Sequence, residues 1–274
     1  MNSFFEAFSH LFMQRALIAG IMLAISAALV GVPLVLRRNS MLSDGLSHVG
    51  FGAFAIAAVL GLVPLSVAIP LVIIVSFFIL RLEQNSRIHG DALTAIISVS
   101  ALALGTFIVS LSGSNVDINS YLFGSILSIG DSEIWASLAL VLAVLIIFTL
   151  FHNQIFAITF DEKFARAIGI NTGLFNTIFA ILCSCVVVIG MRLMGALLIS
   201  SLIVFPTLSA KSLFHSFKSV LISSACISCV AFVIGLLLSY ALAAPTGATI
   251  VLVNLFVLLI AKIIGFINLT QSVP

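Results

Sequence analysis

The stretch IWASLALVLAVLIIFTLF, residues 134–151, runs for eighteen residues without a charged side chain. An α-helix of this length spans about 27 Å, close to the hydrocarbon thickness of a bilayer. The stretch does not alternate between polar and apolar residues as a strand of a membrane barrel does. It therefore predicts a transmembrane α-helix.

Comparable apolar runs recur along the whole chain, which is 62% hydrophobic and 7% charged. A soluble domain carries roughly a quarter charged residues, so the composition predicts an all-α polytopic membrane protein. We interpret residues 1–274 as a single transmembrane domain with a short interfacial helix at about 3–12. The predicted spans are 14–36, 42–62, 64–80, 92–111, 134–151, 173–190, 194–210, 219–241 and 247–266. Because so few residues separate the sixth and seventh spans, an eight-span arrangement with a re-entrant segment is the alternative.

The distribution of lysine and arginine predicts the orientation, since these residues accumulate in cytoplasmic loops. If the loop after the first span is cytoplasmic, nine of the eleven basic residues lie inside and only Arg15 and Arg192 lie outside. The nine are Arg37, Arg38, Arg81, Arg87, Lys163, Arg166, Lys211, Lys218 and Lys262. The loop 112–133 is then extracytoplasmic, and its acids could attract cations or a delivery protein, or simply face water. These acids are Asp117, Asp131 and Glu133. A net charge of +2 without a basic run argues against nucleic-acid binding.

Asp44 and His48 are a polar pair at the start of the second span. A charged residue within a membrane helix costs roughly 2.5–3.5 kcal/mol, so it is a candidate functional residue. Four residues apart, the two side chains share a helix face and supply a carboxylate and an imidazole for a divalent metal. The alternative is that Asp44 caps the helix, which would leave His48 unexplained.

The cytoplasmic segment at about 153–172 has an amphipathic pattern. Its charged residues are Asp161, Glu162, Lys163 and Arg166, and its apolar side consists of Phe160, Phe164, Ala167 and Ile168. Gly169 is a plausible helix end. Such a helix docks a cytoplasmic partner or lies on the membrane, and a solvated connector is the structural alternative.

Two later segments, 191–210 and 240–253, interrupt apolar runs with glycine, serine and proline. Irregular backbone within a membrane is tolerated where it lines a cavity or is buried in protein. Taken singly, each such residue is more often a packing feature. The candidate pathway or gate residues are Ser47, Arg192, Pro206, Pro245 and Gly247.

Six segments share an order and spacing: LVGVPLVLRR (29–38), SDGLSHVG (43–50), YLFGSIL (121–127), FDEKFARAIGI (160–170), the Gly195–Pro206 run and PTGATIVL (245–252). Together they resemble the permease subunits of ATP-binding-cassette (ABC) importers for zinc, manganese and iron, over roughly residues 12–262. The resemblance implies the fold of the vitamin B12 and metal-chelate importers. Ser43, Gly45 and GFGAF (50–54) depart from the family pattern, and we expect them to alter helix flexibility more than ligand chemistry.

The resemblance also implies a homodimer in a bacterial cytoplasmic (inner) membrane, with the transport path on the two-fold axis. Two ATPase subunits would dock on the cytoplasmic segment, and an extracytoplasmic solute-binding protein would deliver the metal. The implied docking residues are Phe160, Asp161, Phe164, Arg166 and Gly169. The chain has no Gly-Lys dipeptide and hence no Walker A loop, so we expect a non-enzymatic subunit whose partner uses ATP.

The expected function is import of a divalent metal held transiently by Asp44 and His48 of both protomers, with no covalently bound cofactor. Zinc is slightly favoured over manganese and ferrous iron, although carboxylate and imidazole suit all three. The positive-inside pattern places the pair toward the cytoplasmic end, as a last hold before release. One rival is an ion- or proton-coupled secondary transporter, which usually needs several intramembrane acids or histidines. A non-transporting scaffold is another, but it has no reason to keep the pair.

Overall fold

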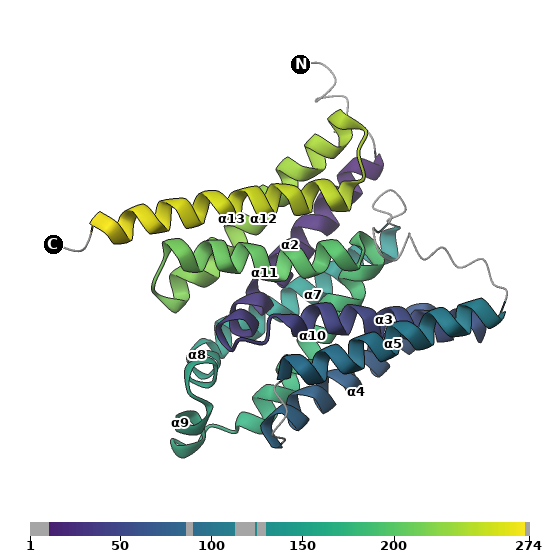
Figure 1. The fold of residues 1–274 in the computed structure, drawn as a ribbon, viewed down its shortest axis with the longest axis horizontal. Helices are drawn as coiled ribbons and strands as arrows, with labels where there is room; N and C mark the ends of the chain where they lie inside the picture. The colour runs from purple at the N-terminus through teal and green to yellow at the C-terminus, as the bar shows by residue number, and fades with distance from the viewer. Residues whose placement is uncertain (1–10, 86–89, 113–123, 125–129, 272–274) are drawn as a thin grey trace.

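The computed structural model describes residues 11–85, 90–112, 124 and 130–271. Every regular element in those residues is an α-helix (Figure 1). They are α2 (Leu11–Leu36), α3 (Met41–Val59), α4 (Pro64–Asn85), α5 (Gly90–Ser112), α7 (Asp131–Leu150), α8 (His152–Phe160), α9 (Glu162–Ala167), α10 (Thr172–Met194), α11 (Ala196–Leu213), α12 (Phe217–Leu242) and α13 (Thr246–Gln271). Four predicted features lie outside the described residues: most of the interfacial helix (3–10), Arg87, Asp117 and YLFGSIL apart from Gly124.

Within the described part of the chain, nine helices are long and apolar enough to cross a membrane. The predicted all-α polytopic fold is therefore confirmed, and each predicted span corresponds to one of these helices. The sixth and seventh spans are α10 and α11, of 23 and 18 residues, so neither is a short re-entrant segment. Only Gly195 separates them, with φ of 89°, a left-handed conformation that glycine adopts without steric cost.

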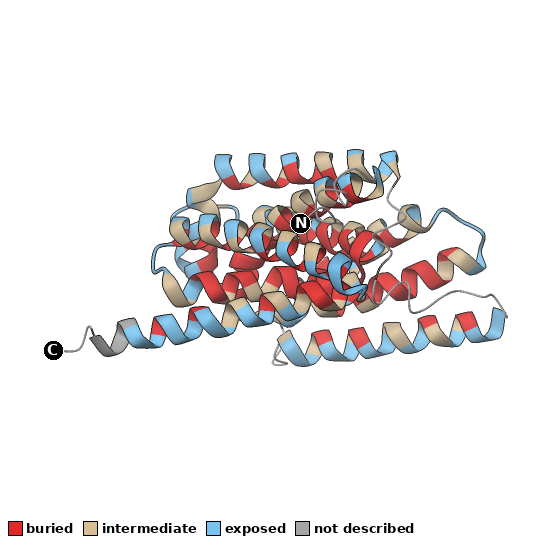
Figure 2. Ribbon diagram, turned by 90° about the horizontal axis from the view of Figure 1, so that it is seen from above, coloured by how far each residue is buried: buried red, intermediate tan, exposed pale blue. Residues whose placement is uncertain are grey.

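The core of the bundle forms around α2, which packs against α7, α10, α11 and α12. Figure 2 shows the buried residues concentrated on the central helices, while the outermost helices are exposed along one side. Two polar links between core helices go to backbone carbonyls. Ser228 Oγ on α12 donates to the Ala24 carbonyl (3.0 Å), and Ser184 Oγ on α10 donates to the Val72 carbonyl (3.3 Å). Such bonds satisfy hydroxyl groups that have no water partner.

One end of the bundle carries two ion pairs. Arg15 Nη2 at the start of α2 lies 2.7 Å from Asp131 Oδ1 at the start of α7. Arg192 Nη2 on the last turn of α10 lies 3.0 Å from Glu133 Oε1. Arg37, at the opposite end of α2, lies beside Glu162. The charges that the sequence assigns to opposite sides of the membrane thus lie at opposite ends of the bundle.

Candidate functional site

Asp44 and His48 project from the first two turns of α3. The residue preceding this helix is Ser40, which makes no side-chain capping hydrogen bond. Asp44 lies inside the first turn, where its charge is favourable to the helix dipole. Asp44 is therefore not the N-cap, which contradicts the simplest capping interpretation.

The Asp44 carboxylate is shared between two helices. Its Oδ2 lies 3.7 Å from His48 Nε2, and its Oδ1 accepts a hydrogen bond from Ser200 Oγ of α11 at 3.3 Å. The Asp44 side chain is 51% exposed and that of His48 is 24% exposed. Among the described residues, no three His, Cys, Asp or Glu side chains form a group that could hold a metal. One chain therefore presents an open, incomplete donor set.

Close packing against α5 holds α3 in place. A Cβ atom at Gly45 would lie 2.4 Å from Thr94 Cγ2, and one at Gly52 would lie 2.9 Å from the Ala101 carbonyl oxygen. The GFGAF segment is helical throughout, and Gly50 packs on the Met191 side chain of α10. Gly45, Gly50 and Gly52 therefore allow helices to approach closely.

The predicted pathway or gate residues have separate structural contacts. Ser47 is fully buried and its hydroxyl donates to the Asp44 carbonyl at 2.7 Å, so it belongs to the helix backbone network. Pro206 is buried inside α11. Pro245 precedes α13, and its carbonyl accepts from the Thr249 amide, while Gly247 is buried in the first turn. Arg192 pairs with Glu133, whose Oε2 also accepts from the Gly130 amide at the start of α7.

The amphipathic segment at about 153–172 forms two short helices, α8 and α9, where the sequence predicts one. The break is at Asp161, whose Oδ1 accepts from the Phe164 amide at 2.9 Å and so caps α9. Gly169, with φ of 88°, follows α9 and confirms the predicted helix end. Arg166 Nη2 lies 3.3 Å from Glu162 Oε1, and its Nε donates to Thr172 Oγ1.

The outer surface of α9 and its flanks is strongly apolar. Phe160 is 62% exposed, Phe164 58% and Ile168 57%, whereas Ala165 is fully buried. Phe160 also contacts the Phe217 ring of α12, with centroids 6.2 Å apart. The predicted amphipathic pattern is therefore present as an exposed apolar surface next to charged side chains.

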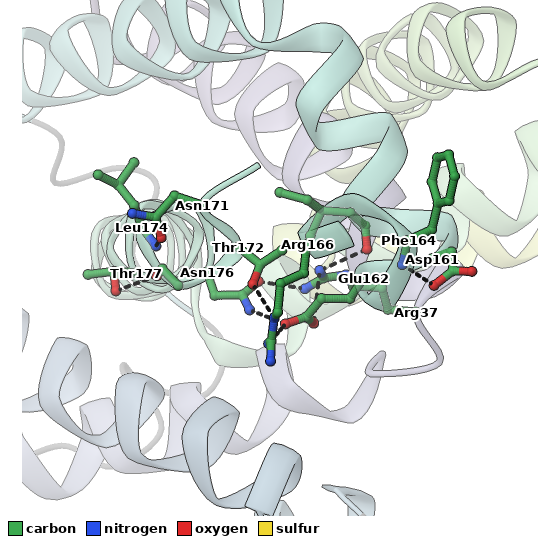
Figure 3. A network of polar contacts seen from close by, with 12 residues as sticks. Arg37, Asp161, Glu162, Phe164, Arg166, Asn171, Thr172, Leu174, Asn176 and Thr177 are labelled. Atoms are coloured by element: carbon green, nitrogen blue, oxygen red, sulfur yellow. Dashed lines mark hydrogen bonds and ion pairs between the residues drawn. The ribbon is translucent and has the colours of Figure 1, made fainter. Parts of the chain in front are cut away.

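A polar cluster connects this segment to the transmembrane helices (Figure 3). Arg37 donates to Asn176 Oδ1 (3.1 Å) and to the Ile158 carbonyl (3.0 Å), and its Nη2 lies 3.7 Å from Glu162 Oε2. Asn176 Nδ2 donates to Glu162 Oε1 at 3.2 Å. Sequence reasoning identified Arg37 only as a cytoplasmic charge. It missed Asn176 because an isolated polar residue at the start of an apolar helix carries no pairing signal.

Comparison with known proteins decides the family. The model of the ABC 3 transport family matches residues 9–265 of the chain. The chain belongs to this family. This confirms the resemblance to metal-importer permeases that the motifs indicated.

Two proteins named for manganese import or transport are similar over nearly the whole chain. The manganese import system permease protein ScaB of Streptococcus gordonii is 30% identical over 254 residues, covering 93% of this chain and 91% of that protein. The manganese transport system membrane protein MntC of Listeria monocytogenes is 27% identical over 250 residues, covering 91% of this chain and 89% of that protein.

Solved structures show the ABC importer permease fold. The structure of PsaBC from Streptococcus pneumoniae in complex with Fab aligns with a TM-score of 0.84 at 30% identity, covering 95% of this chain and 94% of that one. An inward-facing metal-chelate type ABC transporter aligns with a TM-score of 0.72 at 16% identity, covering 94% of this chain and 88% of that one. The second alignment supports the fold alone, and it agrees with the metal-chelate importer type predicted from sequence.

Proposed function

We propose that this chain is the membrane-spanning subunit of an ATP-driven importer of divalent transition metals, with manganese as the foremost cargo. The observation that carries the proposal is the half-exposed Asp44 carboxylate beside His48 on α3. A carboxylate and an imidazole bind manganese, ferrous iron and zinc. The slight preference for zinc expected from sequence has no separate support from these donors, whereas ScaB and MntC are named for manganese.

The donor set is completed by a second copy of the chain. Two protomers about a two-fold axis would contribute two Asp44–His48 pairs, giving four ligands to a metal on the axis. The partial exposure of both side chains in one chain leaves room for such pairing. A pathway must also release its cargo, so binding at this site is weak and transient. The position of Asp44 in the first turn of α3 suits a last hold before release into the cytoplasm.

The other proposed partners bind at opposite ends of the helix bundle. Two ATPase chains dock on the exposed apolar surface of α9, with Phe164 as its centre and Phe160, Asp161, Arg166 and Gly169 around it. ATP is hydrolysed on those chains.

A solute-binding protein delivers metal at the end that carries Asp131 and Glu133, together with the loop containing Asp117. The single domain, residues 1–274, resides in a bacterial cytoplasmic membrane, and Ser47, Arg192, Pro206, Pro245 and Gly247 are its pathway or gate candidates.

The experiment is ATP-dependent metal uptake by the assembled transporter in liposomes, with manganese, zinc and ferrous iron in separate reactions. We expect Asp44→Asn and His48→Ala each to lower uptake at least about tenfold, because the first removes the negative charge and the second the imidazole from both protomers. Asp91→Asn is the matched control, since Asp91 is also in the first turn of its helix, α5. Unchanged uptake in both site variants would exclude the proposed site, and uptake without ATP would indicate a secondary transporter.

A further inference from the structure

Arg37, Glu162 and Asn176 form a closed polar cluster that we name the inner junction (Figure 3). Its members come from the end of α2, the start of α9 and the first turns of α10. Arg37 contacts both Glu162 and Asn176, and Asn176 also contacts Glu162, so each member touches the other two. We call α8 and α9 together (His152–Ala167) the docking segment, after their proposed role. The junction therefore joins the docking segment to two transmembrane helices, α2 and α10.

The junction is partly buried, which distinguishes it from a surface ion pair. The Arg37 side chain is 15% exposed and that of Glu162 is 26% exposed. Exposed pairs contribute little because water and salt screen them, whereas partly buried pairs are screened less. Arg37 also donates to the Ile158 carbonyl in the last turn of α8. It therefore holds the end of α8 as well as the start of α9.

Apolar packing between α9 and the bundle is sparse. Ala165 is the one buried residue of α9, while Phe164 projects to the outside. A cavity of about 430 Å³ lies beside the junction and is bordered by Arg37, Glu162 and Asn176. Side chains do not fill this space, so few apolar contacts join α9 to α2 there. The polar contacts of Glu162 provide the connection between the two helices.

The helices that meet at the junction lead to the other functional features. Arg37 directly follows α2, and near the other end of that helix the Arg15 guanidinium pairs with Asp131. α10 runs from Asn176 to Gly195 and continues as α11, which carries Ser200 next to Asp44. Coupling between distant sites is carried by rigid secondary elements together with the packed and hydrogen-bonded side chains that join them.

We propose that the inner junction transmits movement of the docking segment to α2 and α10 and so couples ATP hydrolysis to metal transport. The inference rests on the proposed function, because it assumes that an ATPase chain binds α9. Arg37, Glu162 and Asn176 are positioning residues: none of the three belongs to the exposed apolar surface of α9 or to the proposed metal site, although Glu162 also pairs with Arg166 on α9 at 3.3 Å. Their loss is expected to separate ATP hydrolysis from transport without releasing the ATPase chain.

The test compares Glu162→Gln with the double variant Glu162→Gln/Asn176→Asp in the assembled transporter. The double variant keeps a carboxylate near Arg37 but moves it from α9 to α10, so Arg37 stays neutralised while its ion pair with the docking segment is lost. For both variants we expect normal co-purification of the ATPase chain and a metal-to-ATP ratio at least about threefold below that of the parent. Lys262→Gln, an exposed charge on α13 outside the junction, is the charge-loss control.

The outcomes separate the two proposals. A parent transporter without ATP-dependent metal uptake refutes the proposed function itself. With the parent active, three results overturn the coupling role: an unchanged ratio in Glu162→Gln, a ratio restored to the parent value in the double variant, or loss of the ATPase chain from Glu162→Gln. Restoration would mean that Glu162 only neutralises Arg37. A lowered ratio in both variants, with the ATPase chain bound, supports transmission through the junction.

Discussion

Ser200 Oγ donates a hydrogen bond to Asp44 Oδ1 at 3.3 Å and thereby joins α11 to the helix that carries the proposed metal ligands. The bond occupies one carboxylate oxygen, and the other oxygen lies beside His48. A hydroxyl donor in this position orients the carboxylate and partly offsets its charge. Groups that hold a ligand in this way often influence metal affinity almost as much as the ligand.

Replacing Ser200 tests this relationship. We expect Ser200→Ala to raise the KM for metal uptake by about tenfold while ATP hydrolysis continues, because the carboxylate loses its orienting donor. Ser201→Ala is the matched control, since Ser201 is buried and bonds to the Leu198 carbonyl instead. Equal effects of the two substitutions on the KM would show that the hydrogen bond from Ser200 to Asp44 does not influence metal uptake.

Phe164 tests the docking surface. Its ring is 58% exposed, so truncation leaves no cavity in the permease. We expect Phe164→Ala to weaken binding of the ATPase chain by about 30-fold, as for an aromatic residue at the centre of an interface. The thermal stability of the isolated permease should not change. Phe256→Ala, which removes an equally exposed ring from α13, should leave ATPase affinity at the parent value.

Substitutions of Asp161 test whether its carboxylate acts as the N-cap of α9 or is recognised directly by the ATPase chain. Its carboxylate caps α9, and replacement of such a residue by alanine costs about 1 kcal/mol of helix stability. We expect Asp161→Ala to weaken ATPase binding and Asp161→Ser to retain it, because serine also caps helices. Binding constants for the two variants distinguish the roles. A serine variant as weak as the alanine variant would mean that the ATPase recognises the negative charge directly.

Replacement of Gly52 tests the helix packing that positions the proposed metal ligands. A Cβ atom there would lie 2.9 Å from the backbone oxygen of Ala101, which cannot move aside unless α3 separates from α5. We expect Gly52→Ala to destabilise the permease by about 1–3 kcal/mol and to lower its Tm. Gly173→Ala is the comparison, because its Cβ would meet only Asn171 Oδ1 at 3.6 Å. A Tm for Gly52→Ala equal to that of the Gly173 variant would contradict the close contact.

The sequence by itself determined the nine spans, the pairing of Asp44 with His48 and the end of the docking segment at Gly169. These features are local. A transmembrane helix satisfies its own backbone and reveals itself by length and hydrophobicity, and residues four apart always share a helix face. The division of the docking segment at Asp161 was missed, because the helical spacing of its charges continues across the break.

Only the tertiary structure decided which distant residues meet. Ser200 is 156 positions from Asp44, and Asn176 is 139 positions from Arg37, yet both pairs are hydrogen-bonded. Lone serine and asparagine residues carry no information about their partners, since helix crossings set these contacts. The sequence alone also does not show that Gly45 and Gly52 pack closely against α5. Local chemistry therefore predicts the candidate ligands and the candidate docking surface, whereas helix packing determined which distant residues contact them.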